Sequence, residues 1–169
     1  MHFGSTGPRN VSLYIAWMGT LTDPANWGVV GMTVLVLSII ITLHYEMLRN
    51  CIRLLPAVAH KRRRRVIFLI LVILLTHAVE IWIFGIAYAF LARFGLFGVI
   101  EGTSPALELI DYVYFSAMVY TTVGFGDLVP EGPIRFMAGM EALTGLVMIT
   151  WSASFTFLEM QRDWREQRD

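Results

Sequence analysis

The chain has 169 residues, of which 56% are hydrophobic and only 15% are charged, with a formal net charge of zero. A soluble globular domain usually has about a quarter of its residues charged. Because the apolar residues also gather in long runs, the composition excludes an ordinary soluble domain and predicts a membrane protein. The balanced charge gives no reason to expect a nucleic-acid partner, and the single cysteine, Cys51, excludes an intrachain disulfide.

Apolar stretches long enough for membrane-spanning helices occur three times, since a hydrocarbon core of about 30 Å takes about 20 helical residues. The predicted spans are 27–48, 66–91 and 134–158. Residues 1–26 are expected to form an extracellular or interfacial segment before them. A further apolar stretch, 109–120, is too short to cross and fits a re-entrant helix. Thr103 or Ser104 is expected to cap that helix.

The basic residues predict the orientation. Segment 49–65, between the first two spans, is rich in arginine and lysine and has no acidic residue. Cytoplasmic loops carry such an excess. We therefore expect a cell-membrane protein whose N-terminus is outside, whose segment between the second and third spans is outside, and whose tail, 159–169, is cytoplasmic. The basic run is also expected to contact anionic lipid headgroups; it consists of Lys61, Arg62, Arg63, Arg64 and Arg65.

The segment before the third span has the composition of an ion filter. It reads Thr121-Thr122-Val123-Gly124-Phe125-Gly126-Asp127. A potassium ion sheds its water where backbone carbonyl oxygens replace the hydration shell. Consecutive inward carbonyls need unusual backbone angles, which glycine tolerates. We expect Val123 and Phe125 to point away from the ions and to pack against the helix at 109–120.

This motif resembles the filter signature of tetrameric potassium channels, in its Phe-for-Tyr variant. Residues 114–116, Tyr-Phe-Ser, and 141–145, Glu-Ala-Leu-Thr-Gly, resemble the same family. The resemblance covers about 66–158, with 27–48 as an added helix. It implies an all-α membrane protein with three transmembrane helices, a re-entrant pore helix and a filter loop, assembled as a homotetramer. It implies passive K+ conduction, no enzymatic activity, and no cofactor or metal other than the permeant K+.

Roles for individual residues follow from the same resemblance. The expected K+-binding residues are Thr122, Val123, Gly124, Phe125 and Gly126. Support is expected from Thr121, Tyr114, Asp127 and Glu141. Some relatives have a pore-helix carboxylate that pairs with the filter aspartate, but this chain has Met118 there. We therefore expect Asp127 to bond to the Tyr114 hydroxyl or to a water, and Glu141 to brace the pore helix.

The third span offers gate candidates. Gly145 is either a hinge or a site of close helix packing, since a missing side chain serves both. Gly139 is less suited to be a hinge because it lies nearer the outer end. If Gly145 faces the pore, Ile149 and Ala153 follow on the same face, and Phe157 forms a hydrophobic constriction near the cytoplasmic mouth.

Ionisable residues inside the spans suggest a second site. Such residues are costly in a membrane and are functional candidates. His77 and Glu80 are three apart and share a helix face, which suits pH or metal sensing, with His44 as a third member. The structural alternative is a pair that bonds to Ser38 or Thr42 on the first span. Two ligands are too few for a closed metal site, and His44 is expected to lie nearer the cytoplasmic side than His77.

The sequence is also compatible with three other functions. They are a non-selective cation channel, a non-conducting accessory subunit, and a membrane protein that handles metal ions or protons through His44, His77 and Glu80. A voltage sensor is not expected, because no span carries an arginine at every third residue.

Overall fold

The computed structural model describes residues 23–58, 62–102 and 106–165, with side chains described for 23–53, 64–102 and 106–162. Most of the predicted N-terminal segment and the end of the predicted tail therefore lie outside the described residues. The elements, in chain order, are α2 (Pro24–Val58), α3 (Arg62–Ala92), β1 (Val99–Gly102), α4 (Leu109–Tyr120), β2 (Leu128–Glu131) and α5 (Ile134–Arg165).

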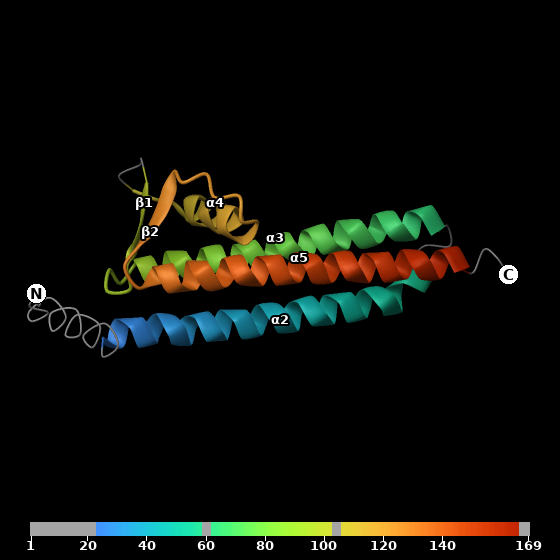
Figure 1. Cartoon of the computed structure of the whole chain (residues 1–169), viewed down its shortest axis with the longest axis horizontal. Coiled ribbons are helices and arrows are strands. Elements are labelled where there is room, and N and C mark those ends of the chain that lie inside the picture. The colour runs from blue at the N-terminus through green and yellow to red at the C-terminus, as the bar shows by residue number, and fades with distance from the viewer. Residues whose placement is uncertain (1–22, 59–61, 103–105, 166–169) are drawn as a thin grey trace, which may run out of the picture.

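Three long helices run side by side, and the short helix α4 lies with the two strands at one end of them (Figure 1). Each of α2, α3 and α5 contacts the other two, and α4 packs on α3 and α5. All three long helices are long and apolar enough to cross a membrane, over Pro24–Arg53, Arg64–Ala92 and Ile134–Arg162. Many of their leucines and isoleucines are exposed, among them Leu71, Leu74 and Leu75 on α3. This apolar exterior suits a lipid environment.

The long helices extend beyond the predicted spans. Helix α2 begins at Pro24, where the Asp23 Oδ1 accepts a 2.9 Å hydrogen bond from the Ala25 N–H. Asp as N-cap followed by Pro is a common helix start. Its C-terminal end, Val58, lies ten residues past the predicted end at 48, and α5 reaches Arg165. Hydropathy predicts only the apolar part of a helix that lies in lipid, so polar turns at the helix ends are not predicted from it.

The all-α prediction is wrong in one respect, because β1 and β2 form a two-stranded antiparallel sheet. Val99 pairs with Glu131 and Gly102 with Leu128. Just outside this pairing, Gly98 has φ +102°, and a Cβ there would overlap the Glu131 carbonyl oxygen. Only glycine permits so close an approach at that angle. The sheet ties the segment before α4 to the segment before α5.

Helix α4 has the predicted bounds, but its predicted cap is wrong. Glu108 is the N-cap residue, and the Asp111 Oδ2 accepts a 2.7 Å hydrogen bond from its N–H in a capping box. Residues 103–105, which include the predicted caps, lie outside the described residues. A carboxylate satisfies the free N–H groups of the first turn as well as a hydroxyl does.

A buried apolar layer joins all the elements. It includes Ile40 of α2, Phe84 and Tyr88 of α3, Phe115 of α4 and Met137 of α5. Near the two-stranded sheet, α2 also meets the loop before β1, since a Cβ on Gly28 would lie 2.6 Å from the Phe97 ring. Helix α2 is therefore packed on the rest of the chain along its length.

Candidate pore segment and its polar supports

The segment 121–127 follows α4 directly and has an alternating backbone. Thr122 has φ +59°, Gly124 +55° and Gly126 +80°, whereas Val123 and Phe125 between them have no positive φ. A positive φ costs little for glycine but is strained for threonine. The N–H of Thr122 donates to the Val119 carbonyl at 2.9 Å, which anchors the strained residue to the end of α4. A backbone that alternates between negative and positive φ points successive peptide groups to the same side.

All seven residues of this segment are exposed in the single chain. Val123 is 54% exposed and Phe125 is 70% exposed. The prediction that these two side chains pack against the helix at 109–120 is therefore wrong within one chain. They lie on a face that the chain's own elements leave uncovered.

Asp127 has the partner that the sequence predicted. The Tyr114 hydroxyl donates to Asp127 Oδ2 at 2.9 Å, across an exposed surface between α4 and the end of the segment. This bond to a carboxylate raises the pKa of Tyr114 above its ordinary value. With Met118 rather than a carboxylate on α4, the Tyr114 hydroxyl is the side-chain hydrogen-bond partner of Asp127 among the described residues.

Glu141 of α5 is fully buried between α3 and α4. Its Oε2 accepts a 2.5 Å hydrogen bond from the Tyr88 hydroxyl, and its Oε1 accepts one of 2.5 Å from Ser116 Oγ. The carboxylate therefore has a donor on each of its oxygens and connects three helices. These are the contacts that the predicted bracing of α4 requires.

Gly145 lies one turn beyond Glu141 and touches the end of α4. A Cβ there would overlap the Tyr120 carbonyl oxygen. The structure therefore shows the close packing that was one of the two interpretations of Gly145; the hinge stays a prediction. Around Gly139 there is open space within the chain.

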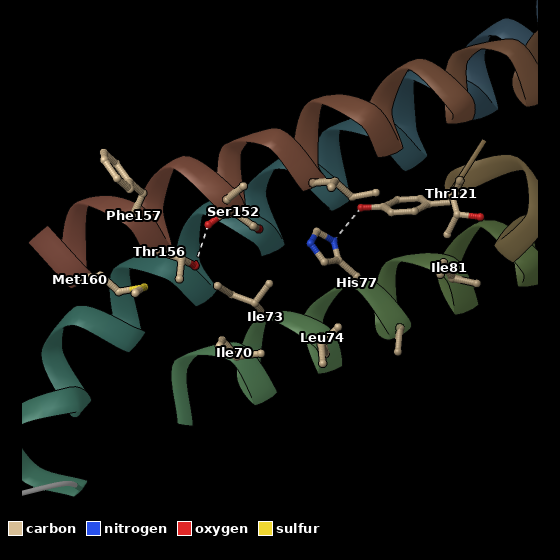
Figure 2. A pocket seen from close by; sticks show the side chains of 14 residues that line it. Ile70, Ile73, Leu74, His77, Ile81, Thr121, Ser152, Thr156, Phe157 and Met160 are labelled. Atoms are coloured by element: carbon tan, nitrogen blue, oxygen red, sulfur yellow. Dashed lines mark hydrogen bonds between the residues drawn. The ribbon is translucent and has the colours of Figure 1, made fainter. Parts of the chain in front are cut away.

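A cavity of about 680 Å³ opens between α3 and α5, below the end of α4 (Figure 2). Its walls are mostly apolar and include Ile73 and Leu74 of α3. The predicted gate residues Ile149, Ala153 and Phe157 all line it. Polar side chains also line this space, among them the imidazole of His77 and the hydroxyl-bearing side chain of Tyr120.

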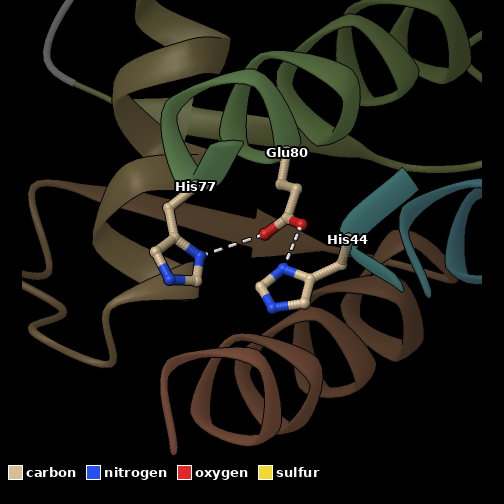
Figure 3. A group of neighbouring side chains, drawn as sticks. All are labelled: His44, His77 and Glu80. Carbon is tan, nitrogen blue, oxygen red and sulfur yellow. Dashed lines mark hydrogen bonds and ion pairs between the residues drawn. The ribbon is translucent and has the colours of Figure 1, made fainter. Parts of the chain in front are cut away.

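Glu80 of α3 is the centre of a second buried polar cluster (Figure 3). Its Oε1 lies 2.8 Å from His44 Nδ1, and its Oε2 lies 3.1 Å from His77 Nδ1. The Tyr120 hydroxyl donates to Oε2 at 2.5 Å and lies 2.9 Å from His77 Nδ1. One carboxylate thus gathers groups from α2, α3 and α4.

The partners expected on the first span were wrong. Ser38 Oγ and Thr42 Oγ1 instead donate to carbonyls of their own helix, each at 2.7 Å. The α2 residue that reaches Glu80 is His44, whose Nε2 also lies 3.2 Å from Ser152 Oγ of α5. Helix α2 continues ten residues past its predicted end, and the His44 ring lies 5.4 Å from the His77 ring; that His44 is the nearer of the two to the cytoplasm stays a prediction. His44 is therefore well inside the helix.

A family model for ion channels matches residues 67–162, which is more than half of the chain. The chain belongs to this ion channel family. No match was found among curated proteins or among solved structures. The predicted membership of a channel family is confirmed, and with three apolar helices this channel chain is a membrane protein. Potassium selectivity and the tetramer stay predictions.

The matched region of this ion channel leaves out α2, which ends at Val58. It includes both buried glutamates, Glu80 and Glu141. It begins two residues after the predicted lipid-contact run 61–65 and includes none of that run. Lys61 lies outside the described residues, and Arg64 is exposed.

Several polar residues of this channel chain were missed by sequence reasoning. They are Tyr88, Ser116, Tyr120 and Ser152, each of which bonds to a buried ionisable side chain. A signal existed for two of them. Ser116 and Tyr120 are four apart on an otherwise apolar short helix, so their polar groups share one face. That face meets α3 and α5, where the two glutamates lie.

Proposed function

We propose that this chain is one subunit of a potassium-selective channel, in which residues 122–126 of four chains form a filter that conducts K+ passively. The observation that carries the proposal is the alternating backbone at Thr122, Gly124 and Gly126, directly after α4. Peptide groups aligned on one side suit a row of carbonyl oxygens that replaces the hydration shell of the ion.

The ion sites are assigned to the carbonyls of Thr122, Val123, Gly124 and Phe125, with the Thr122 hydroxyl at the inner end. Helix α4 acts as the pore helix, and its C-terminal end at Tyr120 meets the filter. The partial negative charge at a helix C-terminus favours a cation there. Asp127 and Tyr114 hold the outer end of the filter.

A homotetramer follows from the exposure of the filter segment. One chain with one such segment cannot enclose a pore, and closed rotational symmetry is the usual way for identical chains to do so. The uncovered side chains of Val123 and Phe125 support contacts with neighbouring subunits. Light scattering of the purified protein in detergent should give a mass of four chains after subtraction of the detergent.

Orientation and gating complete the proposal. The basic segment between α2 and α3 favours a cytoplasmic location for that loop, so the two-stranded sheet and the filter face outward. Arg64 and its basic neighbours then meet anionic lipid headgroups. Phe157 is 55% exposed on the part of α5 far from the two-stranded sheet, and it forms the constriction at the inner mouth. Replacement of Phe157 by alanine should raise the leak of the closed state.

The deciding experiment is current recording from the full chain in planar bilayers with potassium on one side and sodium on the other. We expect a reversal potential close to that of potassium. Gly126→Ala, which puts a side chain at φ +80°, should abolish this selectivity or the current. Gly31→Ala is the matched control, because Gly31 lies on α2 with open space around it and outside the family match.

Two outcomes would contradict the proposal in different ways. A reversal potential near zero would make the chain a non-selective cation channel. No current from a protein that is folded and tetrameric would make it an accessory subunit.

A further inference from the structure

The cluster of His44, His77 and Glu80 is not used by the filter or the gate. Their imidazole nitrogens and carboxylate oxygen lie within 4.8 Å of one another. Figure 3 shows that both imidazoles turn a nitrogen toward the same carboxylate, one from α2 and one from α3. Among the residues whose side chains are described, these three form the only group of this composition that could hold a metal ion.

The charge of this cluster is not balanced by a fixed cation. Glu80 is fully buried, and within 23–53, 64–102 and 106–162 its ion-pair partners are the two histidines, with no lysine or arginine. A buried carboxylate without a permanent counter-ion is costly in a membrane. A cation placed between the imidazoles and the carboxylate removes that cost.

The donor set suits a divalent transition-metal ion. Two imidazole nitrogens and one carboxylate oxygen are a zinc ligand set, with a fourth position left open. Zinc ligands at about 2.0–2.1 Å stand about 3.4 Å apart in a tetrahedron. Glu80 Oε1 lies 2.8 Å from His44 Nδ1, Glu80 Oε2 lies 3.1 Å from His77 Nδ1, and the ligand atoms of the three residues all lie within 4.8 Å of one another. Side-chain rotations that shift these atoms by about 1 Å bring them to the zinc spacing. The hydroxyl of Tyr120, 2.9 Å from His77 Nδ1, is next to the fourth position.

The surroundings supply what a metal site needs besides ligands. Ser152 Oγ lies 3.2 Å from the outer nitrogen of His44, which fixes the ring in place. His77 retains 13% exposure and lines the cavity between α3 and α5, so an ion has a route to the cluster (Figure 2).

We propose that His44, His77 and Glu80 bind a divalent transition-metal ion of the zinc type, and that the bound ion acts on the filter through Tyr120. Tyr120 is the last residue of α4 and is covalently next to the filter segment. An ion that draws Glu80 and His77 toward itself changes the contacts that hold the Tyr120 hydroxyl. The binding part stands apart from the proposed function, whereas the effect on conduction rests on it.

The binding test uses the purified full chain in detergent after chelator treatment, titrated with Zn2+ alone in a calorimeter. We expect one ion per chain, and we expect Co2+ in its place to give the strong visible absorption of a tetrahedral site. His77→Gln should weaken binding by at least about tenfold. Glu141→Gln is the matched control, since it alters a buried glutamate that has hydroxyl partners only, and it should keep the site.

Failure to bind Zn2+ by the unaltered protein would overturn the metal site and leave the cluster as a network that holds helices together. That result needs no variant, so a variant that fails to fold does not obscure it. Binding retained in His77→Gln would also overturn the assignment of the ligands.

The conduction test compares K+ flux in liposomes with Zn2+ and with chelator. We expect flux to change with Zn2+ in the unaltered protein and to stay constant in His77→Gln. Zinc binding without any change in flux would overturn the coupling but keep the site. An absence of K+ flux under all conditions would instead count against the proposed function.

Discussion

Two buried glutamates support the same short helix in different ways. Glu141 on α5 accepts from Tyr88 and Ser116, while Glu80 on α3 accepts from Tyr120 and contacts two histidines. Each accepts a 2.5 Å hydrogen bond from a tyrosine, and each reaches α4. The two contact points on α4 are one helical turn apart, so both carboxylates hold the end of α4 that leads into the filter segment.

The difference lies in the partners. Glu141 is held by hydroxyl groups that keep one charge state over the ordinary pH range, and all of its partners lie within residues 67–162 of the family match. Glu80 is held in part by the imidazoles of two histidines. One of these, His44, belongs to α2, outside the match. The Glu141 contacts thus belong to the shared channel unit, and the Glu80 contacts join the added helix to it.

The largest expected effect on stability comes from replacing each of the two glutamates by alanine and comparing the losses. Glu141→Ala leaves the buried hydroxyls of Tyr88 and Ser116 without their acceptor, which should cost about 3 kcal/mol of stability. Glu80→Ala should cost about half as much, because His77 keeps the Tyr120 hydroxyl and His44 keeps Ser152 as partners. Denaturant titration in detergent micelles measures both. Equal losses would show that the two clusters are equivalent supports.

A second test concerns Gly145, which lies at the contact between the helix that carries Glu141 and the tyrosine that bonds to Glu80. In Gly145→Ala the new methyl group collides with the Tyr120 carbonyl, and overpacking of this kind costs about 2 kcal/mol. Gly139→Ala on the same helix is the control, because nothing lies within 4 Å of its position. The midpoint of thermal unfolding should fall in the first variant and not in the second.

Tyr120→Phe tests how much of the Glu80 cluster depends on one hydroxyl. It removes a donor to Glu80 Oε2 but keeps the ring, and we expect a loss of about 1 kcal/mol. The histidines still satisfy the carboxylate. A loss as large as that of Glu80→Ala, in the same denaturant titration, would mean that the histidines add nothing.

The smallest stability effect is expected at the exposed carboxylate Asp127. Asp127→Asn should leave the unfolding midpoint unchanged but alter the decay of current more than the selectivity, because its bond to Tyr114 holds the outer end of the filter. The raised pKa of Tyr114 means that this bond is present below the ordinary tyrosine value near 10 and weakens only above it. Current decay should therefore be insensitive to pH between about 6 and 9. Unchanged decay in Asp127→Asn would refute this role.

Sequence reasoning was most successful where one helix decides the outcome. The bounds of α4 and the shared face of His77 and Glu80 follow from helical periodicity within a single segment. The two-stranded sheet was not predicted because its strands are four residues each and are separated in the chain by the whole of α4. The contact of His44 with Glu80 escaped because it depends on how deep α2 lies against α3, which packing sets and hydropathy does not.

The position of His44 on α2 has a consequence for biogenesis. Helix α2 precedes α3 in the chain, so it leaves the ribosome and enters the lipid first. An ionisable residue such as aspartate at the centre of a membrane helix opposes insertion by about 2.5–3.5 kcal/mol. Glu80 would bring a comparable penalty into α3, but His44 already stands in the bilayer as a partner. We therefore expect α2 to help α3 insert, because it presents a partner for Glu80.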